Sequence, residues 1–150
     1  MHKRGDFVNI SIKLEGIEML AAKLNSIAGG SALQNGLLQG GEIVRAEAQA
    51  NCPVDTGRLR ESIEVQSLDG TSVVVGPTAE YGVYVEFGTG AKGDSSVAHT
   101  SRKGWVYYNE KTGGFVYTTG QAPQPYLIPA LYSQKDAVVD AIRQGLLSAF

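Results

Sequence analysis

The tripeptide Asp55-Thr56-Gly57 is the most conspicuous candidate for catalysis in this chain. Aspartic proteases carry such a string at the tip of a buried loop, where two aspartates share one proton. Here the tripeptide follows a helical pattern and Pro53, and Arg58 comes directly after it. A neighbouring cation would hold the carboxylate ionised. We therefore expect Asp55 to be structural, with its side chain accepting backbone N–H bonds in a turn that Gly57 permits.

The remaining polar residues form no pattern typical of an active site or a metal site. Cys52 and His99 would make a nucleophile pair on paper, but Cys52 precedes a proline at the end of a helical pattern, where a small buried thiol is the simpler interpretation. His2 and His99 have no metal-ligand neighbours. The chain contains no nucleophile elbow, phosphate loop or dinucleotide motif. The sequence therefore predicts no catalytic residue, no metal, no cofactor and no enzyme activity.

Size and composition indicate one folded domain over residues 1–150. The chain has 150 residues, of which 43% are apolar, and a net charge of −2. These values fit a domain of ordinary size and exclude a disordered chain. A near-neutral chain is not a strong nucleic-acid binder. No apolar run approaches the ~20 residues of a membrane span, and the polar N-terminus lacks the apolar region of a secretory signal, so we expect no membrane partner.

The first third of the chain has the periodicity of one strand and two helices. Alternating apolar residues predict a strand over residues 7–14, and helical spacing predicts helices over residues 16–28 and about 31–51. Gly36, Gly40 and Gly41 weaken the second helix. Either a loose, kinked start or the close approach of another backbone, such as that of a neighbouring subunit, would explain these glycines.

Turn chemistry predicts a hairpin in the middle of the chain. Asp69-Gly70 is favoured in two-residue type I′ turns, with both residues at positive φ, and would join strands at residues 62–68 and 71–76. The aromatic and β-branched run at residues 81–87 predicts a further strand. Residues 88–104 contain four glycines and a net charge of +2, and we expect a mobile loop there.

The last third predicts an aromatic hairpin and a helix. The hairpin spans residues 105–118, and Trp105, Tyr107, Phe115 and Tyr117 would share one face if the register matches. A last helix is expected from about residue 129 to residue 150. Helices and strands are mixed without alternating regularly, so we expect a single α+β domain in which two N-terminal helices and one C-terminal helix pack on a mixed or antiparallel sheet.

Three strings of residues follow one another along the chain. The first string is ANCPVDTGRLRESI at residues 50–63, the second is YGVYVEFGTG at residues 81–90, and the third is APQPYLIPAL at residues 122–131. Taken in this order, they resemble the gene-product-ten-like tail-component family of HK-type siphophages and prophages. Each string alone is modest support, whereas the three in this order are fairly specific. Residues 91–120 are least like a fixed pattern, and the aromatic hairpin has no assigned role.

The resemblance implies a structural virion protein without enzyme activity or cofactor. Such subunits assemble in the host cytoplasm into a ring, usually six-fold, that completes the tail at the neck or head–tail junction. The expected partners are further copies of the chain, the head connector and the tail-tube or terminator protein, while DNA passes through without sequence-specific binding. A tail terminator or connector ring of the same particle and a non-viral protein-interaction module are the alternatives, and an enzyme is the weakest one.

The resemblance also carries over residues with architectural or interface roles. Pro53 to Gly57 would form the helix-to-strand turn, Arg58 would pair with a carboxylate such as Glu86, and Gly88 and Gly90 would open the variable loop. Three prolines would set the approach to the last helix. The full set is Pro53, Asp55, Thr56, Gly57, Arg58, Tyr84, Glu86, Gly88, Thr89, Gly90, Pro123, Pro125 and Pro129.

Overall fold

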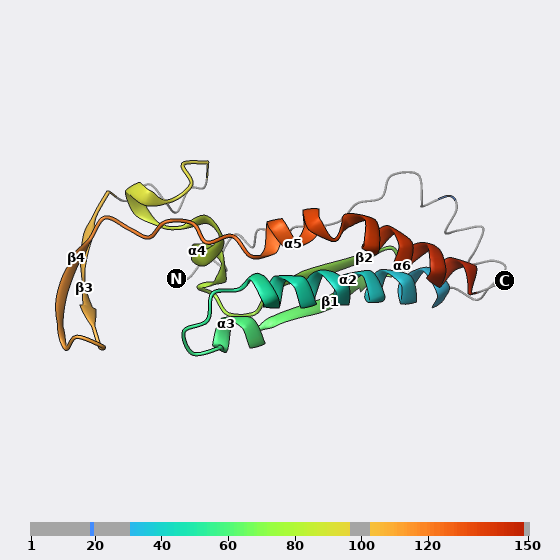
Figure 1. Ribbon diagram of the computed structural model, residues 1–150, viewed down its shortest axis with the longest axis horizontal. Helices are drawn as coiled ribbons and strands as arrows, with labels where there is room; N and C mark the ends of the chain where they lie inside the picture. The colour runs from blue at the N-terminus through green and yellow to red at the C-terminus, as the bar shows by residue number, and fades with distance from the viewer. Residues whose placement is uncertain (1–18, 20–30, 97–102, 149–150) are drawn as a thin grey trace. The chain divides into compact units, whose positions relative to one another are not determined.

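The computed structural model describes Met19, residues 31–96 and residues 103–148, and its chain divides into two compact units (Figure 1). Unit 1 comprises residues 1–79 and 126–150, and unit 2 comprises residues 80–125. The strand expected at residues 7–14 and, apart from Met19, the helix expected at residues 16–28 lie outside the described residues. That residues 1–150 act as one domain stays a prediction.

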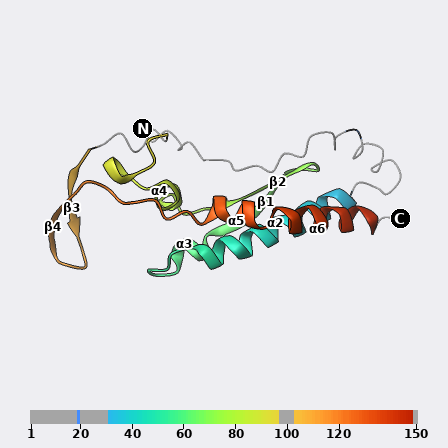
Figure 2. The same ribbon diagram turned by 45° about the horizontal axis from the view of Figure 1, so that its top comes forward.

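Unit 1 is built from helices on a two-stranded antiparallel sheet. Its elements are α2 (Ser31–Asn51), α3 (Arg58–Glu61), β1 (Ile63–Asp69), β2 (Ser72–Pro77), α5 (Leu127–Ser133) and α6 (Lys135–Leu147). Helix α2 lies beside α6 and also contacts α5 and both strands (Figures 1 and 2). The core of unit 1 therefore forms around α2, whose helical span agrees with the sequence prediction.

The core of unit 1 combines aliphatic side chains from helices and strands with one aromatic residue. Ile63 on β1 and Tyr126 before α5 are the largest side chains that are fully buried among the described residues. Burying apolar side chains of this size contributes about 1.5–3 kcal/mol each. The core residues of unit 1 are Leu33, Leu37, Val44, Ala48, Cys52, Leu59, Ile63, Val73, Val75, Tyr126, Leu127, Ala130, Val138, Ala141 and Ile142.

Glycines allow α2 and α6 to touch through their backbones. A Cβ on Gly36 would lie 2.9 Å from the Cα of Ile142, and a Cβ on Gly145 would lie 2.7 Å from the Cα of Gly36. Gly40 faces Val138, so the two helices run antiparallel, and Gly41 faces Val65 of β1. Close backbone approach therefore explains Gly36, whereas Gly40 and Gly41 make room for valine side chains. The partner is the same chain, and the suggested neighbouring subunit is wrong for these positions.

The β1–β2 hairpin is confirmed, but its turn differs from the predicted one. Asp69 pairs with Ser72, so Gly70 and Thr71 are the central residues, and the register shifts between Ser67 and Asp69. Neither Asp69 nor Gly70 has a positive φ, which rules out the type I′ turn. The Asp69 carboxylate accepts hydrogen bonds from the Thr71 amide at 2.8 Å and from the Thr71 and Ser72 hydroxyls at 2.9 Å. Hydrogen bonds to this carboxylate, and not positive φ values, therefore stabilise the turn.

Unit 2 contains α4 (Gly82–Phe87), the short 3₁₀ helix η1 (Gly90–Lys92), β3 (Trp105–Asn109) and β4 (Gly114–Thr118). The strand predicted at residues 81–87 is wrong, because this segment is α4. The Val85 amide donates to the Tyr81 carbonyl oxygen at 3.2 Å, and Gly82 and Glu86 are buried together. Burial four residues apart suits a helix, and tertiary packing overrides the strand preference of valine and tyrosine.

The β3–β4 hairpin is confirmed, whereas the predicted single aromatic face is wrong. Val106 pairs with Tyr117 and Tyr108 pairs with Phe115, so these four side chains share one face. Trp105 and Tyr107 lie on the opposite face. Tyr108 and Phe115 make an edge-to-face contact with ring centroids 5.4 Å apart.

The predicted last helix is two helices. It begins at Leu127, two residues before Pro129, and a break at Gln134 separates α5 from α6. Pro129 lies in the first turn of α5, where a missing N–H costs no helical bond. The Ser133 hydroxyl donates to the Ala130 carbonyl oxygen at 3.2 Å, close to the break. The α+β class is confirmed, with two separate antiparallel sheets in the described part of the chain.

We predict that Gly145→Ala destabilises the protein by about 1–3 kcal/mol, although alanine is intrinsically better than glycine in a helix by ~1 kcal/mol. The added Cβ meets the backbone of Gly36, which cannot rotate away as a side chain can. Thermal unfolding followed by circular dichroism measures the change. Gly76→Ala is the control, because a Cβ there has no neighbour within 4 Å. Equal melting temperatures for both variants would contradict the backbone contact.

We predict that stability falls as pH drops below about 4, partly through Asp69. The Thr71 amide, and then the Ser72 and Thr71 hydroxyls, lower the pKa of this carboxyl from its ordinary value of 3.8. A lowered pKa stabilises the folded state above that value, and the contribution is lost as pH falls through the folded-state pKa. Urea unfolding from pH 7 to pH 2 should show a shallower acid loss for Asp69→Asn. An identical pH profile for the variant would contradict the prediction.

Candidate interaction site

A backbone clamp in unit 2 joins two of the three strings that carry the family resemblance. The Thr89 amide donates to the Gln121 carbonyl oxygen at 2.9 Å, and the Gln121 amide donates back to the Thr89 carbonyl oxygen at 3.2 Å. The Ala91 amide adds a bond to Thr119 at 2.8 Å, and the Gln124 amide adds one to Val85 at 2.8 Å. The segment after α4 and the segment after β4 are thus held together by main-chain bonds.

Glycines make this clamp possible. Gly88, Gly90 and Gly120 have φ values of 73°, 61° and 115°, which side-chain-bearing residues rarely adopt. A Cβ on Gly120 would overlap the Thr89 carbonyl group, and one on Gly88 would overlap the Gln121 carbonyl oxygen and lie 2.8 Å from the Pro123 nitrogen. The sequence singled out Gly88, Thr89, Gly90 and Pro123 separately, and the structure brings these four residues together.

Residues 88–96, which include one side of the clamp, make further local hydrogen bonds. The Asp94 amide donates to the Phe87 carbonyl oxygen at 2.8 Å, and the Asp94 carboxylate accepts bonds from the Ser96 hydroxyl at 2.7 Å and the Ser96 amide at 2.9 Å. The Ser96 hydroxyl and then the Ser96 amide lower the pKa of Asp94. These bonds give residues 88–96 a defined local structure, and residues 97–102 lie outside the described residues. That residues 88–104 form a mobile loop stays a prediction.

The β3–β4 hairpin extends from this clamp and exposes much of its apolar surface. Phe115 is 78% exposed, and Tyr117 is 67% exposed. Residues of this size are normally covered, and contiguous exposed apolar side chains mark contact surfaces. The clamp and the hairpin together form a surface suited to binding another macromolecule.

Helix α4 presents one polar residue inward and one aromatic residue outward. Glu86 is the buried charged residue of the described chain, at 4% exposure, and Tyr84 on the same helix is 43% exposed. No buried side-chain nitrogen or oxygen among the described residues lacks a hydrogen-bond partner. The predicted pairing of Arg58 with Glu86 stays a prediction.

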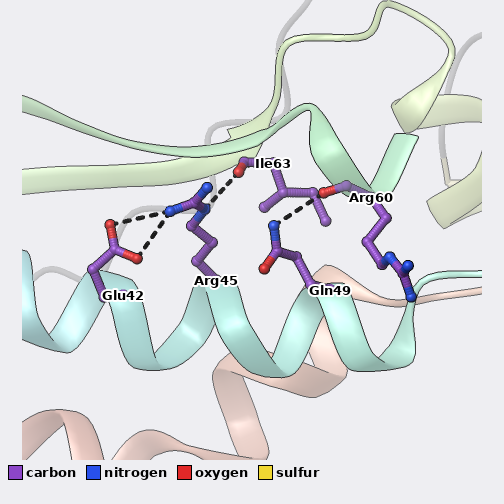
Figure 3. A network of polar contacts seen from close by, with 5 residues as sticks. All are labelled: Glu42, Arg45, Gln49, Arg60 and Ile63. Carbon is purple, nitrogen blue, oxygen red and sulfur yellow. Dashed lines mark hydrogen bonds and ion pairs between the residues drawn. The ribbon is translucent and has the colours of Figure 1, made fainter. Parts of the chain in front are cut away.

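The first string forms a turn between α2 and β1 in unit 1, fixed by side chains of α2 (Figure 3). The Arg45 Nε donates to the Ile63 carbonyl oxygen at 2.8 Å, while its Nη1 contacts the Glu42 carboxylate at 3.1 Å. The Gln49 amide donates to the Arg60 carbonyl oxygen at 3.2 Å. These bonds tie α3 and the start of β1 to α2, so the turn has a fixed path.

Within that turn, Gly57 has a φ of 83° and is the N-cap residue of α3. The Arg58 amide lies 3.4 Å from the Thr56 hydroxyl oxygen, at the long end of hydrogen bonding. Asp55, Thr56 and Arg58 are exposed, and Pro53 is half-buried. Pro123, Pro125 and Pro129 are exposed as well. An exposed turn gives Asp55 none of the burial that an aspartic-protease site requires.

Two further features of the described residues bear on a possible chemical site. They contain no group of three or more histidine, cysteine or acidic residues that could hold a metal ion. A hollow in unit 1 is lined only by apolar residues and one glycine, namely Leu37, Gly41, Val44, Val73, Val75, Leu127, Leu131, Val138 and Ile142. Within the described chain, none of the helices has the length and apolar character needed to cross a membrane.

Sequence reasoning missed the second half of the clamp. Thr119, Gly120 and Gln121 sit in a polar stretch with no periodicity, and a single glycine there has many explanations. Gly145 packs on Gly36. It was also missed, because a single glycine within a regular helical pattern does not show what it contacts. Close backbone approach depends on a partner distant in sequence, so no local signal identifies it.

We predict that Gly120→Ala opens the clamp. In this variant the alanine would have an unfavourable φ, and its Cβ would overlap the Thr89 carbonyl group. It should therefore lower the free energy of unfolding by at least about 1 kcal/mol more than Gly113→Ala does. Gly113 is the matched control because its φ is 68° and a Cβ there has no neighbour within 4 Å. Amide hydrogen exchange measures the effect, with faster exchange expected at Thr89, Ala91 and Gln121. Unchanged exchange at these amides would refute the clamp.

Comparison with known proteins gives one match. The family described as "Bacteriophage HK97-gp10, putative tail-component" matches residues 19–88, a little under half of the chain. The matched segment contains α2, the Pro53–Gly57 turn, the first hairpin and α4. No curated protein and no solved structure matches the chain. Residues 19–88 thus carry the pattern of a bacteriophage tail component, which confirms the predicted family resemblance. The match includes the first string and most of the second, whereas the third string, at residues 122–131, lies outside it.

Proposed function

We propose that this protein is a structural subunit of a tailed bacteriophage or prophage that forms a ring at the head–tail junction and completes the tail. The observation that carries this proposal is the family match over residues 19–88. A tail-component family implies a place in the virion, and the subunits would be made and assembled in the host cytoplasm. The ring would be six-fold and would act without catalysis or a cofactor.

The character of the exposed surface supports a role in assembly. Unit 2 combines a main-chain clamp with a hairpin whose apolar side chains face solvent. Such surfaces serve binding between macromolecules, whereas catalysis needs convergent polar groups in a cavity. The apolar hollow of unit 1 has no such groups. The site therefore fits a subunit that acts through contacts.

The proposed partners follow from a place at the neck. They are further copies of the chain, the head-connector protein on one side and the tail-tube or terminator protein on the other. DNA would pass through the ring without being gripped, because binding to phosphates needs clustered lysine and arginine, and the chain carries 13 of these against 15 acidic residues.

We predict that inactivating the gene in its phage or prophage leaves DNA-filled heads and full-length tails that do not join. Electron microscopy of induced lysates counts free heads, free tails and complete particles. Expression of the intact chain in trans should restore joined particles. A silent substitution in the same codons is the control.

Other outcomes separate the proposal from its alternatives. Tails of uncontrolled length would assign the chain to a tail terminator, and empty heads that have lost their DNA would assign it to a head connector. Normal infectious particles without the gene product would point to an interaction module outside the virion. Each of these results would overturn the proposed tail-completion role.

A further inference from the structure

The part of unit 2 that follows α4 buries none of its side chains. It comprises the described residues 88–96 and 103–124, which include η1, the clamp and the β3–β4 hairpin, and we call it the arm. The buried residues of the arm are Gly88 and Gly90, which have no side chain. Within the described chain, every buried apolar side chain lies in unit 1. Folding of the arm therefore gains little from the hydrophobic effect, which is the dominant favourable term in folding.

Main-chain hydrogen bonds hold the arm together instead. The clamp pairs Thr89 with Gln121 in both directions and Ala91 with Thr119. The net contribution of each bond is small, because the same groups bond to water when the pair opens. Ordering the backbone of one residue costs at least as much free energy as one such bond returns. An element built in this way opens far more easily than a packed core does.

The clamp and the hairpin are continuous through the end of β4. The Gly120 amide donates to the Thr118 hydroxyl oxygen at 3.0 Å, and this hydroxyl donates to the Gly120 carbonyl oxygen at 3.3 Å. A Cβ on Gly104, the residue before β3, would lie 3.2 Å from the Thr118 carbonyl oxygen, so the base of the hairpin is closely packed. A two-stranded hairpin alone is marginal in water. The hairpin therefore loses its support when the clamp opens.

The arm ends before the core of unit 1 begins. The Gln124 amide donates to the Val85 carbonyl oxygen of α4 at 2.8 Å, and this is the last printed main-chain bond of unit 2 along the chain. Two residues later, Tyr126 is 1% exposed and belongs to the core of unit 1. The arm contributes no residue to that core, so the two can differ widely in stability.

We propose that the arm is a strap that opens as one cooperative unit while unit 1 stays folded, and that the glycine clamp is its latch. Gly88, Gly90 and Gly120 close the latch, because their φ values of 73°, 61° and 115° bring the two segments within hydrogen-bonding distance. The open state is a minor population that amide exchange detects. The device lets the hairpin reorganise while unit 1 keeps its fold, and it does not depend on the proposed function.

Native-state amide exchange of the full chain, followed by NMR at several low urea concentrations, tests the strap. The β3–β4 amides and the clamp amides of Thr89, Ala91 and Gln121 should share one protection factor. They should exchange at least about 100-fold faster than the slowest amides of α2 and α6. Their exchange should also depend less on urea, because opening the arm exposes less surface than unfolding the whole chain. Equal protection in the arm and in unit 1 would overturn the proposal.

Two glycine variants test whether the arm opens as one unit. Gly120→Ala strains the latch and should speed exchange at least about fivefold at the clamp and at the β3–β4 amides alike, with α2 and α6 unchanged. Gly113→Ala strains the other end of the arm, at the hairpin turn, where φ is 68°. It should speed the clamp amides by the same factor as the β3–β4 amides. Acceleration confined to the clamp in Gly120→Ala, or to the hairpin in Gly113→Ala, would overturn the single strap.

Ile142→Val is the reciprocal variant in unit 1. It shortens by one carbon a side chain that is 3% exposed, and it should speed exchange of the slowest α2 and α6 amides about threefold to tenfold. The arm amides should keep their wild-type rates, because opening of the arm leaves the unit 1 core folded. Faster exchange of the arm amides by the same factor as those of α2 and α6 would show that the arm and unit 1 open together, and would overturn the proposal.

Discussion

Both units depend on backbone segments that approach each other more closely than any side chain would allow. In unit 1, α2 and α6 touch at Gly36 and Gly145, and α2 also packs on both strands of the sheet. In unit 2, Gly88 and Gly120 let two extended segments exchange main-chain hydrogen bonds. In both places a side chain on the glycine would push the two backbones apart. The close packing in unit 1 and the short hydrogen bonds in unit 2 would then be lost.

The two contacts assign different tasks to the two units. Unit 1 buries its aliphatic residues and ties the Pro53–Gly57 turn to α2 through Arg45 and Gln49, which gives it a conventional core. Unit 2 has little core of its own and is organised by main-chain bonds. Its apolar side chains, Phe115 and Tyr117 above all, remain in solvent. This division suits a subunit with a stable body and an element reserved for contacts, as the proposed ring requires.

Part of the fold could be predicted because its signals are local. The helix at residues 31–51 follows from the 3.6-residue spacing of Leu33, Leu37 and Val44, and both hairpins follow from short β-rich runs separated by turn residues. The family pattern is also local, since it consists of short strings in a fixed order. The hairpin turn was placed within one residue of its true position, although Asp69 ends β1 and stabilises the turn through its carboxylate.

The remaining features needed the tertiary structure, because their causes lie far away in the sequence. Residues 81–87 have strand-forming side chains, yet packing of Gly82 and Glu86 on one side makes them a helix. The register of β3 with β4 decided which aromatic residues share a face, and it separated Trp105 and Tyr107 from Phe115 and Tyr117. Sequence alone determined which residues favour helices, strands and turns, and which family the first half resembles. Only the folded chain decided what each glycine and aromatic residue faces, since that depends on partners many residues away.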